Sequence, residues 1–366
     1  MSGQKPVNTT FENFDLKAEA EEARADTVRF AFEFPELLAD FRVADAKANK
    51  AKKTSRRSGY ITIALVLFTL LIGAASPVFH AFDFSHDVEL VIAYGSAALG
   101  LLGAILGLLG LRKSSSRHTW LRNRLKTESM RLFHFQFMAA QFPALIAAGA
   151  NPALRPAYLA ARAKAYLALT SGPLADPDAE LHRISKQSGA YDFRAAAEGH
   201  LAGMEDTAIA ETVFAAWRKL RLQWQLGYCE AMLSPTRTGK RMSARQTEEA
   251  FSKFGWASVA TVITLHIGLF AADPDPTSQP RVLLEVGVVW TALVALAARA
   301  LEAGLQPSRD VERYEQYRAN ILVATERFEA ADGVAGKLEV MRGFERNSLE
   351  EMRIFMRTHS RSSFML

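Results

Sequence analysis

Four side chains that can bind metal ions lie close together in one short segment of the sequence: His80, Asp83, His86 and Asp87. Histidine and carboxylate side chains are common zinc ligands, and a site here would need two histidines and a carboxylate to converge. Their spacing matches no established metal motif, whereas polar residues are typical of any short turn. We therefore expect a turn without a metal ion, and we predict no cofactor.

The sequence offers little for catalysis. The single cysteine, Cys229, excludes an intrachain disulfide and a cysteine zinc cluster, and it lies in no nucleophile motif. The segment TRTGKRMS contains a Gly-Lys pair but lacks the glycine five residues earlier that a phosphate-binding loop requires. We predict that the chain is not an enzyme, that Cys229 is a buried thiol, and that the basic segment is a solvated flank.

The apolar residues are concentrated in four blocks. The first, residues 60–82, has no formally charged residue, and as a helix it is roughly 34 Å long, enough to span a bilayer. The second block, 88–111, has a similar length and one charge, Glu89, at its start, whereas the blocks at 254–272 and 282–298 are shorter. This distribution predicts an all-α integral membrane protein with four spans.

Short, acidic, turn-rich segments separate the two blocks of each pair, so each pair is expected to form a transmembrane hairpin. The segments outside the hairpins are rich in Lys and Arg, which places them and both termini in the cytoplasm. The net charge of +5 comes from these flanks and favours anionic lipid headgroups over nucleic acid as a partner. The predicted parts are cytoplasmic N-terminal helices (1–58), the first hairpin (59–112), a cytoplasmic helical region (113–253), the second hairpin (254–299) and cytoplasmic C-terminal helices (300–366).

The segments outside the spans read as helices, with no convincing strand. Thr9 and Glu12 form a candidate capping box, and residues 36–58 are expected to continue as a helix into the first block. Residues 117–142 form an amphipathic helix, and residues 197–232 resume a helical pattern. Five prolines between these segments are expected to mark turns between short helices: Pro143, Pro152, Pro156, Pro173 and Pro177.

The two hairpins also align without a gap at an offset of 194 residues. This offset places Trp120 on Tyr314 and Arg124 on Arg318, so an aromatic residue and an arginine recur at the same distance after each hairpin. The pattern predicts a tandem duplication in which both copies have the same orientation in the membrane.

Trp120, Arg124 and Glu128 are spaced four residues apart and therefore share one helix face just after the second block. An arginine stacked on tryptophan and paired with glutamate could lock two helices together and carry a gating signal. The alternative, which we favour, is an interfacial tryptophan anchor beside a structural ion pair.

Small residues recur in the second block at intervals of four, three, four and three, which is one continuous helix face: Ser96, Gly100, Gly103, Gly107 and Gly110. Glycine costs about 1 kcal/mol relative to alanine in a soluble helix, but in lipid small residues let helix backbones approach closely. This face is predicted to be a packing surface. It could contact the first block of its own hairpin, or it could contact another subunit and rearrange when a path opens.

Three polar residues inside the second hairpin are candidates for lining a pore: His266, Thr264 and Glu285. An ionisable group inside a span is a functional candidate by default. The residues three and four positions before His266 are Ile263 and Val262, so we expect its hydrogen-bond partner on another helix. Pore lining and hydrogen bonding between helices both remain open for His266.

The first hairpin and the helix RHTWLRNRLKTE after it resemble the SLATT superfamily, bacterial two-transmembrane effectors associated with nucleotide-signalling defence systems. Trp120, Arg124 and Glu128 match its W-x3-R-x3-E pattern, and the resemblance covers roughly residues 30–142. The second copy, about residues 236–340, has Leu322 where Glu128 would fall.

The resemblance implies an oligomerising effector that permeabilises the bacterial inner membrane during phage infection, triggered by a cytoplasmic protein or nucleotide. Two other classes of function remain open. The chain could be a small channel or transporter with parallel repeats. It could also be a membrane-anchored scaffold or sensor whose work is done by residues 113–253.

Overall fold

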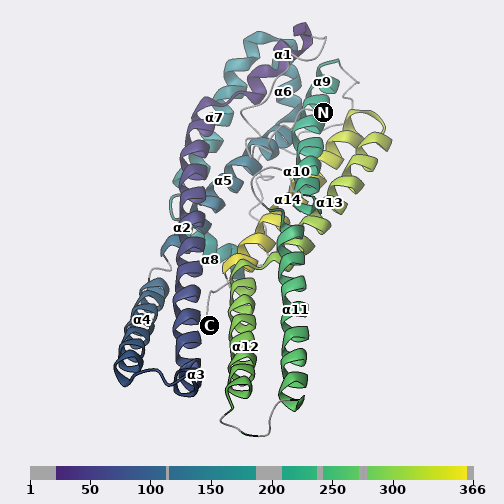
Figure 1. Cartoon of the computed structure of the whole chain (residues 1–366). Helices are drawn as coiled ribbons and strands as arrows, with labels where there is room; N and C mark the ends of the chain where they lie inside the picture. Colours follow the sequence, from purple (N-terminus) through teal and green to yellow (C-terminus); the bar gives the residue numbers. More distant parts are fainter. Residues whose placement is uncertain are drawn as a thin grey trace. The chain divides into compact units, whose positions relative to one another are not determined.

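The computed structural model describes residues 22–112, 115–186, 208–236, 242–271, 275 and 278–360, and its regular elements there are all helices (Figure 1). The predicted all-α fold class is confirmed for these residues. The α-helices are α1 (Glu22–Phe32), α2 (Pro35–Ala74), α3 (Ser76–Ala81), α4 (His86–Arg112), α5 (Ser115–Ala140), α6 (Phe142–Ala150), α7 (Arg155–Ser171), α8 (Pro177–Lys186), α9 (Ala208–Trp217), α10 (Trp224–Leu233), α11 (Ala244–Ala271), α12 (Gln279–Leu305), α13 (Pro307–Ala330) and α14 (Gly333–Ser360). A 3-10 helix, η2 (Pro152–Leu154), precedes α7, and a π-helical turn, η4 (Arg218–Gln223), joins α9 to α10.

The helix boundaries follow the sequence signals closely. α2 is one continuous helix of 40 residues that contains both the charged segment and most of the first apolar block, as expected. Proline stands at the first or second position of α6, η2, α7 and α8, because its fixed φ and missing N–H fit the first helical turn. The capping box expected at Thr9 and Glu12 lies outside the described residues.

Among the described residues, three helical segments are long and apolar enough to cross a membrane: Pro35–Ala81, Ala244–Ala271 and Gln279–Ala330. A bent pair, Ser116–Ala140 and Phe142–Ala150, would add a fourth if its two helices, which meet at 73°, were counted as one span. Because α5 buries charged side chains such as Arg131, we do not count the bent pair of α5 and α6 as a membrane span. The second apolar block forms α4, and its crossing remains a prediction.

The chain divides into two compact units. The helical unit comprises Met1–Asn49, Thr119–Ser243 and Val311–Ser360, and the hairpin unit comprises Lys50–His118, Ala244–Asp310 and Arg361–Leu366. In the helical unit Phe142 stacks on Phe214, with ring centroids 4.9 Å apart. Arg162 of α7 donates hydrogen bonds to the backbone oxygens of Ala31 and Glu33, each at 2.8 Å. This guanidinium satisfies carbonyl groups that the end of α1 leaves without helical partners.

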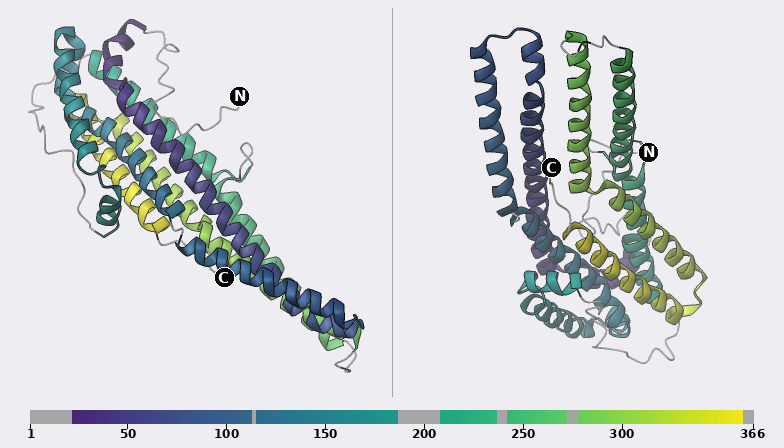
Figure 2. Two further views of the ribbon diagram at one scale, coloured as in Figure 1. Left: turned by 90° about the vertical axis from the view of Figure 1, so that its left-hand side faces the viewer. Right: turned by 90° about the horizontal axis from the view of Figure 1, so that it is seen from below.

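In the hairpin unit the helices lie in one row, in the order α4, α2, α12, α11, and the layer is one helix thick (Figures 1 and 2). At the centre of the row Ile63 of α2 packs against Ala297 and Ala300 of α12. Trp290 of α12 donates its indole N–H to the backbone oxygen of Leu71, at 2.9 Å. The two hairpins therefore meet through α2 and α12, whereas α4 and α11 form the two edges of the row.

Candidate functional site

The residues Trp120, Arg124 and Glu128 lie on one face of α5, inside the helical unit. Arg124 Nη2 and Glu128 Oε1 form an ion pair at 2.6 Å, with 19% and 15% of the two side chains exposed. The Trp120 ring is buried and meets two rings of α14 edge to face, Phe355 at 5.9 Å and His359 at 5.1 Å between centroids. This motif is therefore a buried contact between α5 and α14.

Glu128 binds two arginines of its own helix. Its second oxygen, Oε2, accepts a hydrogen bond from Arg131 Nη1 at 2.7 Å, and Arg124 also lies 3.6 Å from Asp45 of α2. Burial alone would raise the pKa of Glu128, but the charges of the surrounding arginines, Arg124 and Arg131 foremost, together outweigh burial and hold the pKa below its ordinary value. Glu128 is therefore ionised at neutral pH, and it ties the face of α5 to α2 through Arg124.

A second ion pair, which the sequence did not reveal, joins η4 to α14. Arg221 Nε and Nη2 donate to the two carboxylate oxygens of Glu345, at 2.8 and 2.9 Å, and both side chains are almost fully buried. The guanidinium lies over the rings of Phe135 and Phe344, 5.2 and 5.5 Å from their centroids. Burial lowers the pKa of Arg221, but Glu345, Tyr317 and Glu128 together raise it by more, so the net pKa lies above the ordinary value. π-Helical turns such as η4 are often found at functional sites.

Tyr314 and Arg318 were expected to correspond to Trp120 and Arg124, and only the aromatic pair occupies similar environments. Tyr314 of α13 is as buried as Trp120, with 8% of each residue exposed. Its hydroxyl lies 3.2 Å from that of Tyr228. Arg318, in contrast, is exposed, whereas Arg124 is largely buried in ion pairs. The aromatic positions of the two copies thus occupy similar environments and the arginines do not.

α13 nevertheless reaches the same part of α14 as α5 does. Arg313 forms an ion pair with Glu351, and its guanidinium lies 5.0 Å from the ring centroid of Phe355. Phe355 is also a neighbour of Trp120. The helices that follow the two hairpins in the sequence, α5 and α13, therefore both contact α14 at one aromatic residue.

The glycine face of α4 packs at Gly100 and Gly103 against α2 of the same hairpin. A Cβ atom added to Gly100 would lie 2.9 Å from Thr69 Cγ2, and one added to Gly103 would lie 3.4 Å from Val66 Cγ2. Ser96 donates its hydroxyl to the backbone oxygen of Ala93. The surroundings of the two remaining members, Gly107 and Gly110, lie outside the described part of the chain.

Each of the three candidate pore residues has a partner on its own helix. His266 Nδ1 lies 2.8 Å from the backbone oxygen of Val262, and Thr264 donates to the backbone oxygen of Ala260 at 2.9 Å. Glu285 pairs with Arg281 at 3.1 Å. The expectation that His266 would find its partner on another helix is therefore wrong, because the carbonyl group one turn earlier is within reach.

In the turn of the first hairpin a histidine lies close to a glutamate. His80 Nδ1 lies 3.3 Å from Glu89 Oε1. Among the described residues no group of three or more His, Cys, Asp or Glu side chains is placed to hold a metal ion. The Cys229 thiol is buried, and burial raises its pKa to about 12. Its thiolate, the reactive form, is therefore scarce at neutral pH.

Searches of protein-family models, of curated proteins and of solved structures find no match to this chain.

Proposed function

We propose that this chain is an effector of the bacterial inner membrane that assembles when triggered and permeabilises the membrane during phage infection. The observation that supports this proposal best is the single row of α4, α2, α12 and α11 (Figure 2). A row one helix thick encloses no water-filled path, and membrane pores require backbone and polar groups to line such a path. A pore would therefore need several copies of the chain around one axis.

The proposed trigger acts through α14. In the sequence α5 follows α4 and α13 follows α12, and both helices contact α14 at Phe355. A cytoplasmic protein or nucleotide that displaces α14 would change the packing of both helices at once. The ion pair of Arg221 with Glu345 would hold the resting arrangement, because separating a buried pair leaves charges without partners.

Expression of the full chain in bacteria, with growth and entry of a membrane-impermeant dye measured together, tests the proposal. We expect growth arrest with dye entry, and leakage of an encapsulated dye from phosphatidylglycerol vesicles that contain the purified chain. Ion flux without toxicity would favour the channel or transporter alternative. Membrane localisation with neither toxicity nor leakage, even at high abundance, would contradict the proposal and favour a scaffold or sensor.

A further inference from the structure

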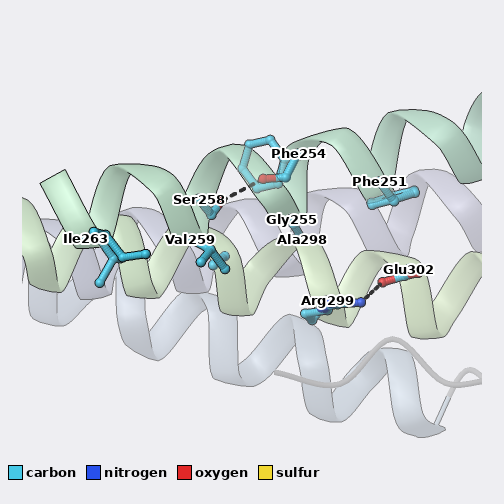
Figure 3. Close-up of a pocket in the computed structure, with 11 residues that line it drawn as sticks. Phe251, Phe254, Gly255, Ser258, Val259, Ile263, Ala298, Arg299 and Glu302 are labelled. Carbon is cyan, nitrogen blue, oxygen red and sulfur yellow. Dashed lines mark hydrogen bonds and ion pairs between the residues drawn. The ribbon is translucent and has the colours of Figure 1, made fainter.

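A groove with a volume of about 260 Å³ lies between α11 and α12 in the hairpin unit (Figure 3). Small residues on both helices leave this space open: Gly255 and Ser258 on α11, and Ala295 and Ala298 on α12. Ser258 donates its hydroxyl to the backbone oxygen of Phe254 at 2.9 Å, so it needs no partner in the groove. Most of the groove therefore presents apolar atoms.

One end of the groove is charged. Arg299 and Glu302 line the end near Phe251, whereas Ile263 lines the opposite end (Figure 3). Arg299 Nη1 donates to Glu302 Oε2 at 2.7 Å, and 72% of the Arg299 side chain is exposed. A guanidinium has five N–H donors, so one contact with Glu302 leaves others available. Arg299 ends the fourth apolar block, on the side of the basic flanks, where lipid headgroups are expected.

We propose that this groove binds one acyl chain of an anionic phospholipid, with the lipid phosphate on Arg299. A phospholipid has a phosphate at one end and a hydrocarbon chain extending from it. The groove has the same arrangement, with the Arg299 guanidinium at one end and apolar side chains along the rest. Arginine binds phosphate through parallel N–H donors, and such charge-assisted contacts are stronger than neutral ones. This inference requires only that α11 and α12 lie in the membrane, so it is independent of the proposed pore activity.

The test uses the full chain, purified in a non-ionic detergent and titrated with dioleoylphosphatidylglycerol or dioleoylphosphatidylcholine. Native mass spectrometry then counts the lipid molecules retained by each protein. We expect the wild-type chain to retain phosphatidylglycerol preferentially, and Arg299→Gln to lower that affinity by about tenfold, since one charge-assisted contact is lost. The matched control is Arg281→Gln, which removes an arginine from the other end of α12 that also pairs with a glutamate, Glu285.

A second pair of variants tests the groove itself. Ala298→Phe fills the space and should abolish retention of both lipids. Ala260→Phe adds the same side chain at an exposed position of α11 outside the groove, and it should have no effect. Helix content and thermal unfolding of every variant are compared with wild type. Arg299→Gln changes an exposed side chain, so it stays informative even if Ala298→Phe does not fold.

Equal retention of the two lipids by the wild-type chain would overturn the proposal. Unchanged phosphatidylglycerol affinity in Arg299→Gln, or undiminished lipid retention in a folded Ala298→Phe protein, would also overturn it. Loss of crosslinked dimers in Ala298→Phe without any change in lipid retention would assign the groove to a second copy of the chain instead.

Discussion

Arg221 and Glu345 form a bidentate ion pair, in which both carboxylate oxygens accept hydrogen bonds from one guanidinium. Both side chains are almost fully buried. Trp217 adds a donor 3.4 Å from the same carboxylate. The pair joins η4 to α14, so it fixes the position of the C-terminal helix within the helical unit. The contribution of this ion pair to the free energy of unfolding can be measured against an exposed ion pair of the same chain, Arg218 with Glu329.

Glu345→Ala is expected to lower the free energy of unfolding by about 3–5 kcal/mol, because Arg221 would remain buried without its partner. The double variant Arg221→Met with Glu345→Met should be less destabilised, since neither charge remains. Denaturant unfolding followed by circular dichroism measures both effects. The control is Glu329→Ala, which breaks an exposed pair with Arg218 and should cost at most about 1 kcal/mol. Equal losses for Glu345→Ala and Glu329→Ala would refute this prediction.

Trp120 and Phe355 should be energetically coupled, because their rings meet edge to face across α5 and α14. A double-mutant cycle with Trp120→Ala and Phe355→Ala is expected to give an interaction energy of about 0.5–1.5 kcal/mol. If α14 carries the trigger, Phe355→Ala should also change dye entry in cells at unchanged membrane abundance. Strictly additive unfolding energies together with wild-type dye entry would show that this contact has neither role.

The predicted topology can be tested with reporter fusions. Fusions at Ser85 and Thr277 should report the periplasm, whereas fusions at residue 180 and at the C-terminus should report the cytoplasm, because basic flanks stay inside. Thr277 lies outside the described residues, and Ser85 lies in the turn between α3 and α4. Alkaline phosphatase and green fluorescent protein activities give opposite signals on the two sides. A periplasmic C-terminus would exclude the two-hairpin topology.

Gly100→Ile should reduce the amount of chain that accumulates in the membrane, because even a Cβ atom there would lie 2.9 Å from Thr69. The larger side chain would push α4 away from α2. Gly95→Ile is the matched control on the same helix, since nothing lies within 4 Å of a Cβ added at Gly95. Quantitative immunoblots of membrane fractions compare the two. Equal accumulation of both variants would show that close contact at Gly100 does not hold the hairpin together.

Cys229 should react slowly with a thiol reagent in the folded chain at pH 8. Its pKa is raised by burial to about 12, so the group is protonated there, and the reagent must also reach a buried atom. Because the folded pKa is raised, the stability from the neutral thiol is present below the unfolded pKa and is lost as the pH rises toward 12. Labelling should accelerate more than about a hundredfold in denaturant. Fast labelling of the native chain would contradict burial.

Local signals in the sequence predicted the helices well. The first apolar block, the helical segment before it and the prolines between short helices all depend on spacing within one element, and α2, α6, α7 and α8 follow them. The amphipathic helix at residues 117–142 was also predicted, and its aromatic residues Trp120 and Phe133 are buried in α5. These features need no knowledge of how distant segments pack.

The ion pairs of the helical unit could not be predicted in the same way. Glu345 is far from Arg221 in the sequence, and nothing in the local pattern of either residue specifies the other. The partner of His266 was missed for a different reason. The side chains of Ile263 and Val262 cannot form hydrogen bonds, but the backbone oxygen of Val262 lies 2.8 Å from His266 Nδ1.

The single row of helices has a consequence for how the proposed activity depends on abundance. Inserted in a bilayer, one chain would present two broad faces to lipid and two edges, α4 and α11, so an isolated copy would leave the bilayer sealed. The probability that several copies meet rises with a power of their density in the membrane. Under the proposed function, permeability should then stay low over a wide range of expression and increase steeply above it, so the chain could be present at low density without harm to the cell.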